Sequence, residues 1–173
     1  MKTLIICKSI HQGNTEKIAK KIAKVLNADL IKPEGFNSKD IKKYDIIGLG
    51  SGIYGYKHHK SILNIANNSL NLNDKNVFIF STSGIINKAQ HNNLKKILEK
   101  KNAKFIGEFF CRGFNKNNNR DNLTTFEYIM IVGLQLIGGI NKGRPNEADF
   151  KRAEDFAEKI KKVKMNSPSA THI

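Results

Sequence analysis

The sequence predicts an α/β domain with a doubly wound parallel sheet, because short apolar runs alternate with segments of helical periodicity along the chain. Its 173 residues are about the size of one domain, and 39% apolar residues suffice for a buried core. The sequence shows no internal repeat and no interdomain linker. We therefore expect one domain over residues 1–165 and a loose tail at 166–173, where no periodic pattern is left.

Five short runs rich in Ile, Leu, Val and Phe predict the strands. Most of them are continuous rather than alternating, as expected where helices cover both faces of a sheet. The third run is expected to end at its glycines. In chain order the predicted strands are Leu4–Cys7, Asp29–Lys32, Asp45–Gly50, Asn76–Ser81 and Ala103–Phe110.

Apolar residues at helical spacing predict four helices between and after these strands. The last helix has the clearest start, since Asn146 can cap it, Asp149 stands three residues further on and Pro145 blocks extension backwards. The predicted helices are Asn14–Leu26, His59–Asn67, Lys88–Lys101 and Glu147–Lys164.

The chain is strongly basic, with 30 Lys and Arg against 15 Asp and Glu and a formal net charge of +15. Such an excess suits nucleic acid, an anionic membrane surface or an acidic protein. The charge is spread almost evenly over the two halves of the chain, and no recognisable nucleic-acid module accompanies it. We therefore favour an evenly basic, solvated surface, with an acidic protein partner as the main alternative, and expect no binding of nucleic acid.

Cys7 and Cys111 cannot form a disulfide framework, and both are expected to be packed residues rather than redox thiols. His58 and His59 are expected at a helix start rather than as metal ligands, since no cysteine or carboxylate stands beside them at ligand spacing. No signal-peptide pattern is present, which favours a cytoplasmic protein. The most apolar stretch, Tyr128–Ile140, is too short for a membrane span of roughly 20 residues.

Ligands of a doubly wound sheet bind at the carboxyl ends of the strands, near the point where strand order reverses. The loop Ser9–Thr15 at one such end combines hydroxyl residues and a glycine with the start of a helix, which suits an anion. It contains neither Lys nor Arg, so hydroxyls and backbone amides would hold a phosphate there. The alternative is an ordinary strand-to-helix turn capped by Asn14 or Thr15.

Two further loops follow the third and fourth predicted strands. Gly50–His59 contains glycines that permit close backbone approach, and Tyr54 and Tyr56 offer flat rings for stacking. Ser81–Ile85 offers hydroxyls and amides to the polar edge of a heterocycle. Taken alone, the first could be a loop whose tyrosines pack on the surface, and the second a helix N-cap region. Together the three loops predict a pocket for a phosphate joined to a planar aromatic group.

The order and spacing of these motifs resemble the flavodoxin family, in particular its short single-domain branch, from Met1 to about Lys164. The resemblance implies a five-stranded sheet of order 2-1-3-4-5, helices on both faces and a non-covalently bound FMN. It is carried by the segments Gly13–Thr15, Tyr44–Tyr54, Ser81–Gly84, Cys111–Phe114 and Gly138–Pro145.

The family's site residues carry over to matching positions of this sequence. Tyr54 matches the aromatic residue that stacks on the flavin, and Gly55 matches the peptide that can turn its carbonyl toward flavin N5 when that atom gains a proton. The residues that would hold the phosphate are Ser9, His11, Gln12, Gly13, Asn14 and Thr15. Those that would flank the isoalloxazine are Ser51, Gly52, Ile53, Tyr54, Gly55, Tyr56, Ser81, Thr82, Ser83 and Gly84.

The resemblance implies an electron-transfer protein that carries electrons between redox partners. The alternative on the same scaffold is an FMN-dependent oxidoreductase acting on a quinone, a nitro-compound or a porphyrinogen. The basic charge favours an acidic, ferredoxin-like partner and a less negative flavin potential than in acidic relatives. A phospho-acceptor regulatory domain is not expected, because the first strand is followed by Lys8-Ser9-Ile10 instead of acidic residues. The segment Asn115–Gln135 either covers the sheet edge or forms a lid or a homodimer surface.

Overall fold

The structure, a computed structural model, describes residues 2–10, 12–69, 71–114 and 141–165. The predictions for His11, for Asn115–Gln135 and for the tail at 166–173 fall outside these residues and stay predictions. None of the helices within the described ranges combines the length and the apolar character that a bilayer crossing needs.

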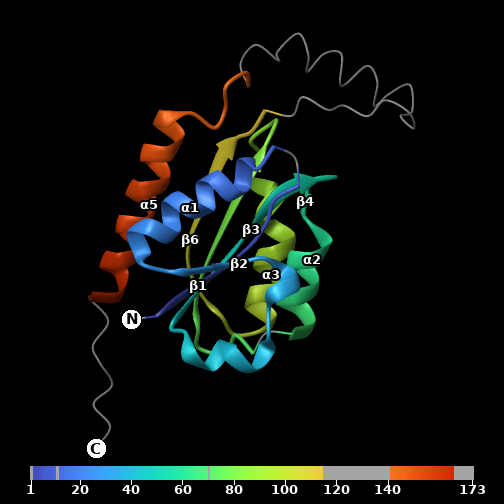
Figure 1. Ribbon diagram of the computed structural model, residues 1–173. Helices are drawn as coiled ribbons and strands as arrows, with labels where there is room; N and C mark the ends of the chain where they lie inside the picture. The colour runs from blue at the N-terminus through green and yellow to red at the C-terminus, as the bar shows by residue number, and fades with distance from the viewer. Residues whose placement is uncertain (1, 11, 70, 115–140, 166–173) are drawn as a thin grey trace, which may run out of the picture.

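Five parallel strands form the sheet in the order β2-β1-β3-β5-β6 (Figure 1). Counted along the chain as the five predicted strands, this is the order 2-1-3-4-5, so the predicted doubly wound fold is confirmed. A short sixth strand that the sequence analysis did not predict, β4 (Lys57–His58), pairs antiparallel with the end of β3. The parallel strands are β1 (Thr3–Lys8), β2 (Asp29–Ile31), β3 (Ile46–Tyr54), β5 (Asn76–Ser83) and β6 (Lys104–Arg112).

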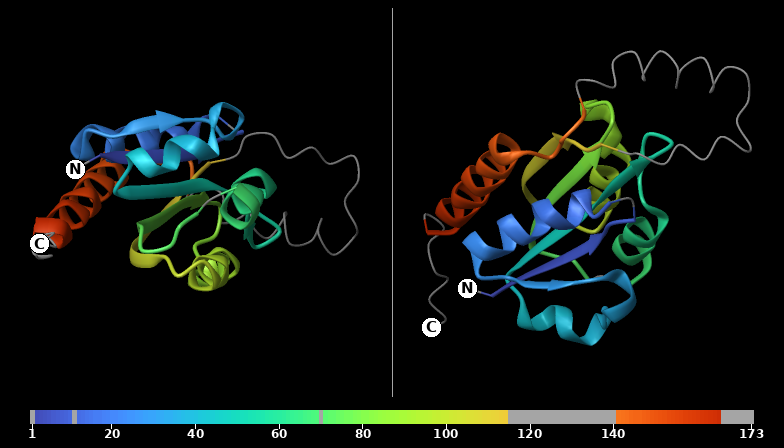
Figure 2. Two further views of the ribbon diagram at one scale, coloured as in Figure 1. Left: turned by 90° about the horizontal axis from the view of Figure 1, so that it is seen from below. Right: turned by 45° about the horizontal axis from the view of Figure 1, so that its top comes forward.

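Helices cover both faces of the sheet, as Figure 2 shows from below. On one face, α1 (Asn14–Leu26) and α5 (Glu147–Met165) pack on Phe78 and Phe80 of β5. On the other face, α2 (Lys60–Asn64) and α3 (Asn92–Lys100) pack on a second apolar cluster that includes Leu49 of β3. Each buried layer removes apolar surface from water at about 25 cal/mol per Å², the main favourable contribution to folding.

The two helices of the second face are shorter than the sequence predicted. Helix α2 (Lys60–Asn64) continues into a π-helical turn, η3 (Ile65–Ser69), and α3 (Asn92–Lys100) follows a 3₁₀ turn, η4 (Lys88–His91). Two more 3₁₀ turns join β2 to β3, and they are η1 (Pro33–Gly35) and η2 (Ser38–Lys43).

The start of α5 is the capping box that the sequence predicts. Asn146 Oδ1 accepts from the Asp149 amide at 3.2 Å, and Asp149 Oδ2 accepts from the Asn146 amide at 3.1 Å. Asp149 is fully buried, and the Arg144 guanidinium also pairs with it at 2.7 Å. This arrangement fixes the segment that enters α5 beside the carboxyl end of β6.

Strand β3 does not end at its glycines, which corrects the predicted boundary at Gly50. It continues to Tyr54, and Gly48 and Gly50 lie opposite Phe78 and Phe80 of β5. A Cβ at Gly50 would lie 2.1 Å from the Phe80 ring, and one at Gly48 would lie 2.4 Å from the Phe78 ring. These glycines make room for the aromatic rings of the neighbouring strand.

Candidate functional site

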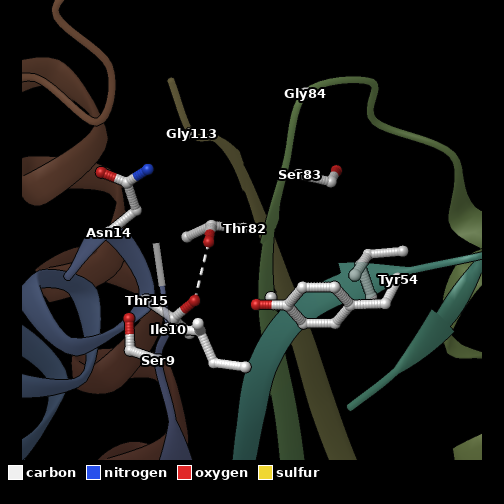
Figure 3. Close-up of a pocket in the computed structure, with 11 residues that line it drawn as sticks. Ser9, Ile10, Asn14, Thr15, Tyr54, Thr82, Ser83, Gly84 and Gly113 are labelled. Carbon is white, nitrogen blue, oxygen red and sulfur yellow. Dashed lines mark hydrogen bonds between the residues drawn. The ribbon is translucent and has the colours of Figure 1, made fainter. Parts of the chain in front are cut away.

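A cleft of about 170 Å³ lies at the carboxyl ends of β1, β3 and β5, where the three predicted loops meet (Figure 3). The neighbours β1 and β3 flank the point where strand order reverses, the position where doubly wound sheets bind ligands. No charged side chain is among the described residues that line the cleft. The predicted site residues that line it are Ser9, Asn14, Thr15, Gly52, Ile53, Tyr54, Thr82, Ser83 and Gly84.

The start of α1 forms one end of the cleft. Gly13 is the residue before the helix and adopts φ +68°, a left-handed conformation that glycine reaches without a steric cost. Thr15 Oγ1 lies 2.7 Å from Thr82 Oγ1, so the first and third loops are joined by a buried hydrogen bond (Figure 3). Asn14 Nδ2 donates to Phe114 O at 2.7 Å. Helix amides and hydroxyls thus gather here without a lysine or arginine, as the sequence predicts for an anion cradle.

A hairpin between β3 and β4 carries the aromatic wall. Gly55 and Tyr56 form its two-residue turn, with φ +53° and +61°, the positive values of a type I′ turn. The Tyr54 ring lies over Gly52, because a Cβ at Gly52 would come within 2.9 Å of the Tyr54 hydroxyl. Partial burial raises the pKa of Tyr54, so this ring stays neutral at physiological pH. The Tyr54 and His59 rings pack nearly perpendicular to each other, with their centroids 5.5 Å apart.

Two hydrogen bonds hold the third loop, Ser81–Ile85, in place. Ser83 Oγ donates to Ile85 O at 2.5 Å, which folds the loop back on itself. Asn141 Nδ2 donates to Gly84 O at 2.9 Å, and this contact ties the loop to the segment that leads into α5. The Asn141 Oδ1 atom is buried and has no hydrogen-bond partner among the described residues. A buried acceptor of this kind beside the cleft suits a polar ligand edge.

Several predicted residues do not line the cleft. Ser51 and Ser81 are fully buried beneath it, with their hydroxyls bonded to histidines. Gln12 and Gly13 directly precede α1 and are not among the lining residues. Gly55 and Tyr56 form the hairpin turn outside the cleft, and Tyr56 is 60% exposed. His11 lies outside the described residues.

Three residues near the cleft were not predicted as site residues. Ile10 lies inside the first loop, where an apolar side chain gave no signal for an anion. Gly113 lines the cleft and leaves room for Asn14, whose Nδ2 would lie 3.1 Å from a Cβ at that position. Asn141 acts through Gly84. Both Gly113 and Asn141 fall inside segments quoted for the family resemblance, and that placement was the only sequence signal for them.

The two cysteines are packed and unreactive, in line with their predicted role. Cys7 and Cys111 are both buried, and burial raises the pKa of each thiol to about 12. A thiolate, the reactive form, is therefore essentially absent at pH 7. No group of three or more His, Cys, Asp or Glu side chains suited to a metal ion occurs in the part of the chain that the structure describes.

Comparison with known proteins gives consistent relatives. The family model of the flavodoxin domain matches residues 4–135. The uncharacterised protein MJ0298 of Methanocaldococcus jannaschii is 42% identical over 164 residues, covering 94% of this chain and 99% of that protein. Among solved structures, a flavodoxin from the domain Archaea superposes with a TM-score of 0.67 at 15% identity, covering 95% of this chain and 99% of that one. Oxidised flavodoxin 2 from Bacillus cereus gives a TM-score of 0.64 at 19% identity, covering 94% and 99%.

Proposed function

This chain belongs to the flavodoxin family, and from that premise we propose that it binds FMN non-covalently and carries electrons between redox partners. Membership of the family implies a flavin cofactor. Two points go beyond family membership and are our proposal: that the flavin is FMN, and that the protein acts as an electron carrier. The observation that carries them is the convergence of three loops on one cleft that has helix amides at one end and an aromatic wall at the other.

The residues of the cleft fit FMN in their chemistry. The amides at the start of α1, with the hydroxyls of Ser9 and Thr15, supply the neutral donors that a phosphate needs. Gly84 lets the backbone approach a flat ring, Gly52 makes room for the Tyr54 ring, and the amides near Ser83 can meet the polar edge of the ligand. Such a site requires no lysine, because the helix dipole and several donors share the anionic charge.

The bound FMN would supply the redox chemistry, since it accepts electrons from one partner and returns them to another. The protein's own residues bind it, orient it and exclude water. Tyr54 is half-buried and would cover one side of the ring system. Gly55 adopts φ +53° and has no Cβ, so a change in its backbone angles meets less steric restriction than at any other residue type. This freedom would allow the Gly55 carbonyl to turn toward the ligand when the ligand gains a proton.

The mouth of the cleft supports a role in protein docking. Among the described residues, the large hydrophobic side chains exposed to solvent include Ile10, Tyr56 and Ile85 of the three loops around the cleft, and Ile86 directly after the third loop. An exposed apolar group of this kind marks a contact site. With a net charge of +15, the chain would attract an acidic partner, such as a ferredoxin-like protein, and salt would weaken that attraction. A cytoplasmic location is part of this proposal.

The test starts with the purified protein, which should be yellow or turn yellow when FMN is added. Denaturation should then release FMN, identified by its retention in chromatography. Release of FAD, or failure to bind any flavin, would overturn the cofactor assignment. To separate a carrier from an oxidoreductase, NAD(P)H oxidation is followed with a quinone or a nitro-compound present. Steady turnover by the protein alone would replace the carrier with the enzyme.

A further inference from the structure

Beneath the cleft lies a pair of buried serines whose hydroxyls face away from it. Ser51 of β3 and Ser81 of β5 are register partners, and each directly precedes a cleft residue, Gly52 or Thr82. Because side chains alternate along a strand, both serines face the side of the sheet that α2 and α3 cover. Both are at most 1% exposed, and each hydroxyl meets a buried histidine.

His58 of β4 holds the first serine. Ser51 Oγ donates to Gly52 O at 2.7 Å and lies 3.0 Å from His58 Nδ1. The hydroxyl has one proton, which Gly52 O accepts, so His58 Nδ1 carries a proton and donates to Ser51 Oγ. The His59 amide also donates to this oxygen, at 2.9 Å. His58 thereby fixes the floor of the cleft at Gly52 through Ser51.

His91 of η4 holds the second serine. Its Nδ1 lies 3.0 Å from Glu108 Oε2, and its Nε2 lies 2.8 Å from Ser81 Oγ. A carboxylate only accepts, so Nδ1 carries the proton and Ser81 donates to Nε2. Lys95 Nζ donates to the other carboxylate oxygen at 2.8 Å, which neutralises Glu108. His91 is thus held from α3, β5 and β6 at once.

The two histidine rings contact each other. Their centroids are 4.8 Å apart with planes at 39°, and the His91 ring also stacks on Phe110 at 4.0 Å. His58 belongs to the hairpin that carries Tyr54, and His91 follows the loop that carries Ser83. The ring contact therefore joins the two walls of the cleft from below. Burial lowers the pKa of both histidines to about 3, so both are neutral at pH 7 and do not repel each other.

We propose that His58 and His91 are positioning residues that hold the two walls of the cleft in one spacing, acting through Ser51 and Ser81 and through the contact between their rings. This inference rests on the proposed function where flavin binding is its readout. It assigns Ser51 and Ser81 a role beneath the site in place of the direct flavin contact that the sequence predicted.

The experiment is a double-mutant cycle with His58→Phe, His91→Phe and the double variant, with His58→Asn as the conservative variant. Asparagine keeps a nitrogen donor for Ser51, whereas phenylalanine keeps only the ring. Lys60→Ala, on the exposed side of α2, is the matched control. The readouts are the FMN dissociation constant, the visible circular dichroism of the bound flavin, and the urea midpoint of the apoprotein.

We expect His58→Phe to weaken FMN binding about tenfold and to change the visible circular dichroism, while His58→Asn restores most of both. The double variant should bind FMN far better than the product of the two single losses predicts. Ser51, His58, His91 and Ser81 form one chain of contacts between the walls, and each single change already interrupts this chain at a serine. Additive losses, or an unchanged affinity and spectrum in both phenylalanine variants, would overturn the inference.

Failure of this inference is distinguishable from failure of the proposed function. If the wild-type chain binds no flavin, the proposed function fails. The double-mutant cycle is then evaluated only from the urea unfolding midpoints of the apoprotein. Non-additive midpoints then support the contact between the walls, and additive midpoints refute it. If His58→Phe does not fold, the Ser51→Ala and His91→Phe pair replaces it in the same cycle with the same criteria.

Discussion

Thr15 and Thr82 share a buried hydrogen bond, with their Oγ1 atoms 2.7 Å apart although 67 positions separate them in the chain. The resemblance gave them different tasks, Thr15 at the phosphate and Thr82 at the flavin ring. In the structure they stand at the same end of the cleft, between α1 and β5 (Figure 3). Their bond therefore ties the anion cradle to the strand beside it before any ligand arrives.

This bond should contribute measurably to the stability of the apoprotein. We expect Thr82→Val to lower the free energy of unfolding by about 1–2 kcal/mol, because it leaves the Thr15 hydroxyl buried without its partner. The double change Thr15→Val/Thr82→Val should cost less than the sum of the two single changes. Urea unfolding of the apoprotein measures all three, and strictly additive costs would show that the hydroxyls do not interact.

Gly50 should resist even the smallest side chain. A Cβ there would lie 2.1 Å from the Phe80 ring, which is itself fully buried and cannot retreat. We expect Gly50→Ala to lower the free energy of unfolding by about 1–3 kcal/mol through overpacking. Adding Phe80→Leu, which shortens the opposing side chain, should recover part of the loss. If Gly50→Ala unfolds at the same urea concentration as the wild type, the close approach of strand and ring is wrong.

Gly50 also shows which features of the fold the local sequence pattern could not predict. Apolar runs located all five parallel strands, and the topological rule placed the cleft, because both depend on local pattern and on chain order. The meaning of Gly50 depends on its register partner Phe80, a long-range pairing that local pattern does not contain. With the strand ended too early, the alternation that turns Ser51 to the same face as Leu49 was lost. Ser51 was assigned to the cleft by its match to the family pattern, and no predicted alternation spoke against that assignment.

Tyr56 occupies a strained position in the hairpin turn. Its φ of +61° is left-handed, which costs a residue with a Cβ about 1–2 kcal/mol relative to the right-handed region. Asparagine tolerates this conformation, so we expect Tyr56→Asn to raise the free energy of unfolding by about 0.5–1 kcal/mol. Thermal and urea unfolding of the apoprotein measure the change. Tyr56→Ala serves as the control, since alanine keeps the strain and should bring no gain.

Buried His58 and His91 should make the protein sensitive to mild acid. Their pKa values fall to about 3 in the folded state, whereas unfolded histidine titrates near 6.5, so the unfolded chain binds more protons below pH 6.5. The stabilisation is fully present above pH 6.5 and is lost as the pH falls toward 3. Well below pH 6.5 the slope should approach about 1.4 kcal/mol per pH unit for each histidine.

Urea unfolding at pH 7, 6 and 5 tests this pH dependence. The charged groups that face these rings are Glu108 and Lys95, which form an ion pair with each other. His91→Phe removes one of the two titrating groups and should roughly halve the slope. A free energy of unfolding that does not change between pH 7 and pH 5 would contradict the neutral, buried state of both rings.

The basic charge of the chain should raise the reduction potential of the bound flavin relative to acidic members of the family. No acidic side chain is among the described residues that line the cleft, and Lys57 is exposed beside the hairpin turn. Reduction adds negative charge to the ligand, which nearby positive charge stabilises.

We expect Lys57→Glu to make the potential more negative by roughly 20–40 mV at low salt and by less at high salt. Lys162→Glu, near the far end of α5, changes the net charge equally and should leave the potential nearly unchanged. A spectroelectrochemical titration decides, and equal shifts in both variants would assign the effect to net charge rather than to the charges at the cleft.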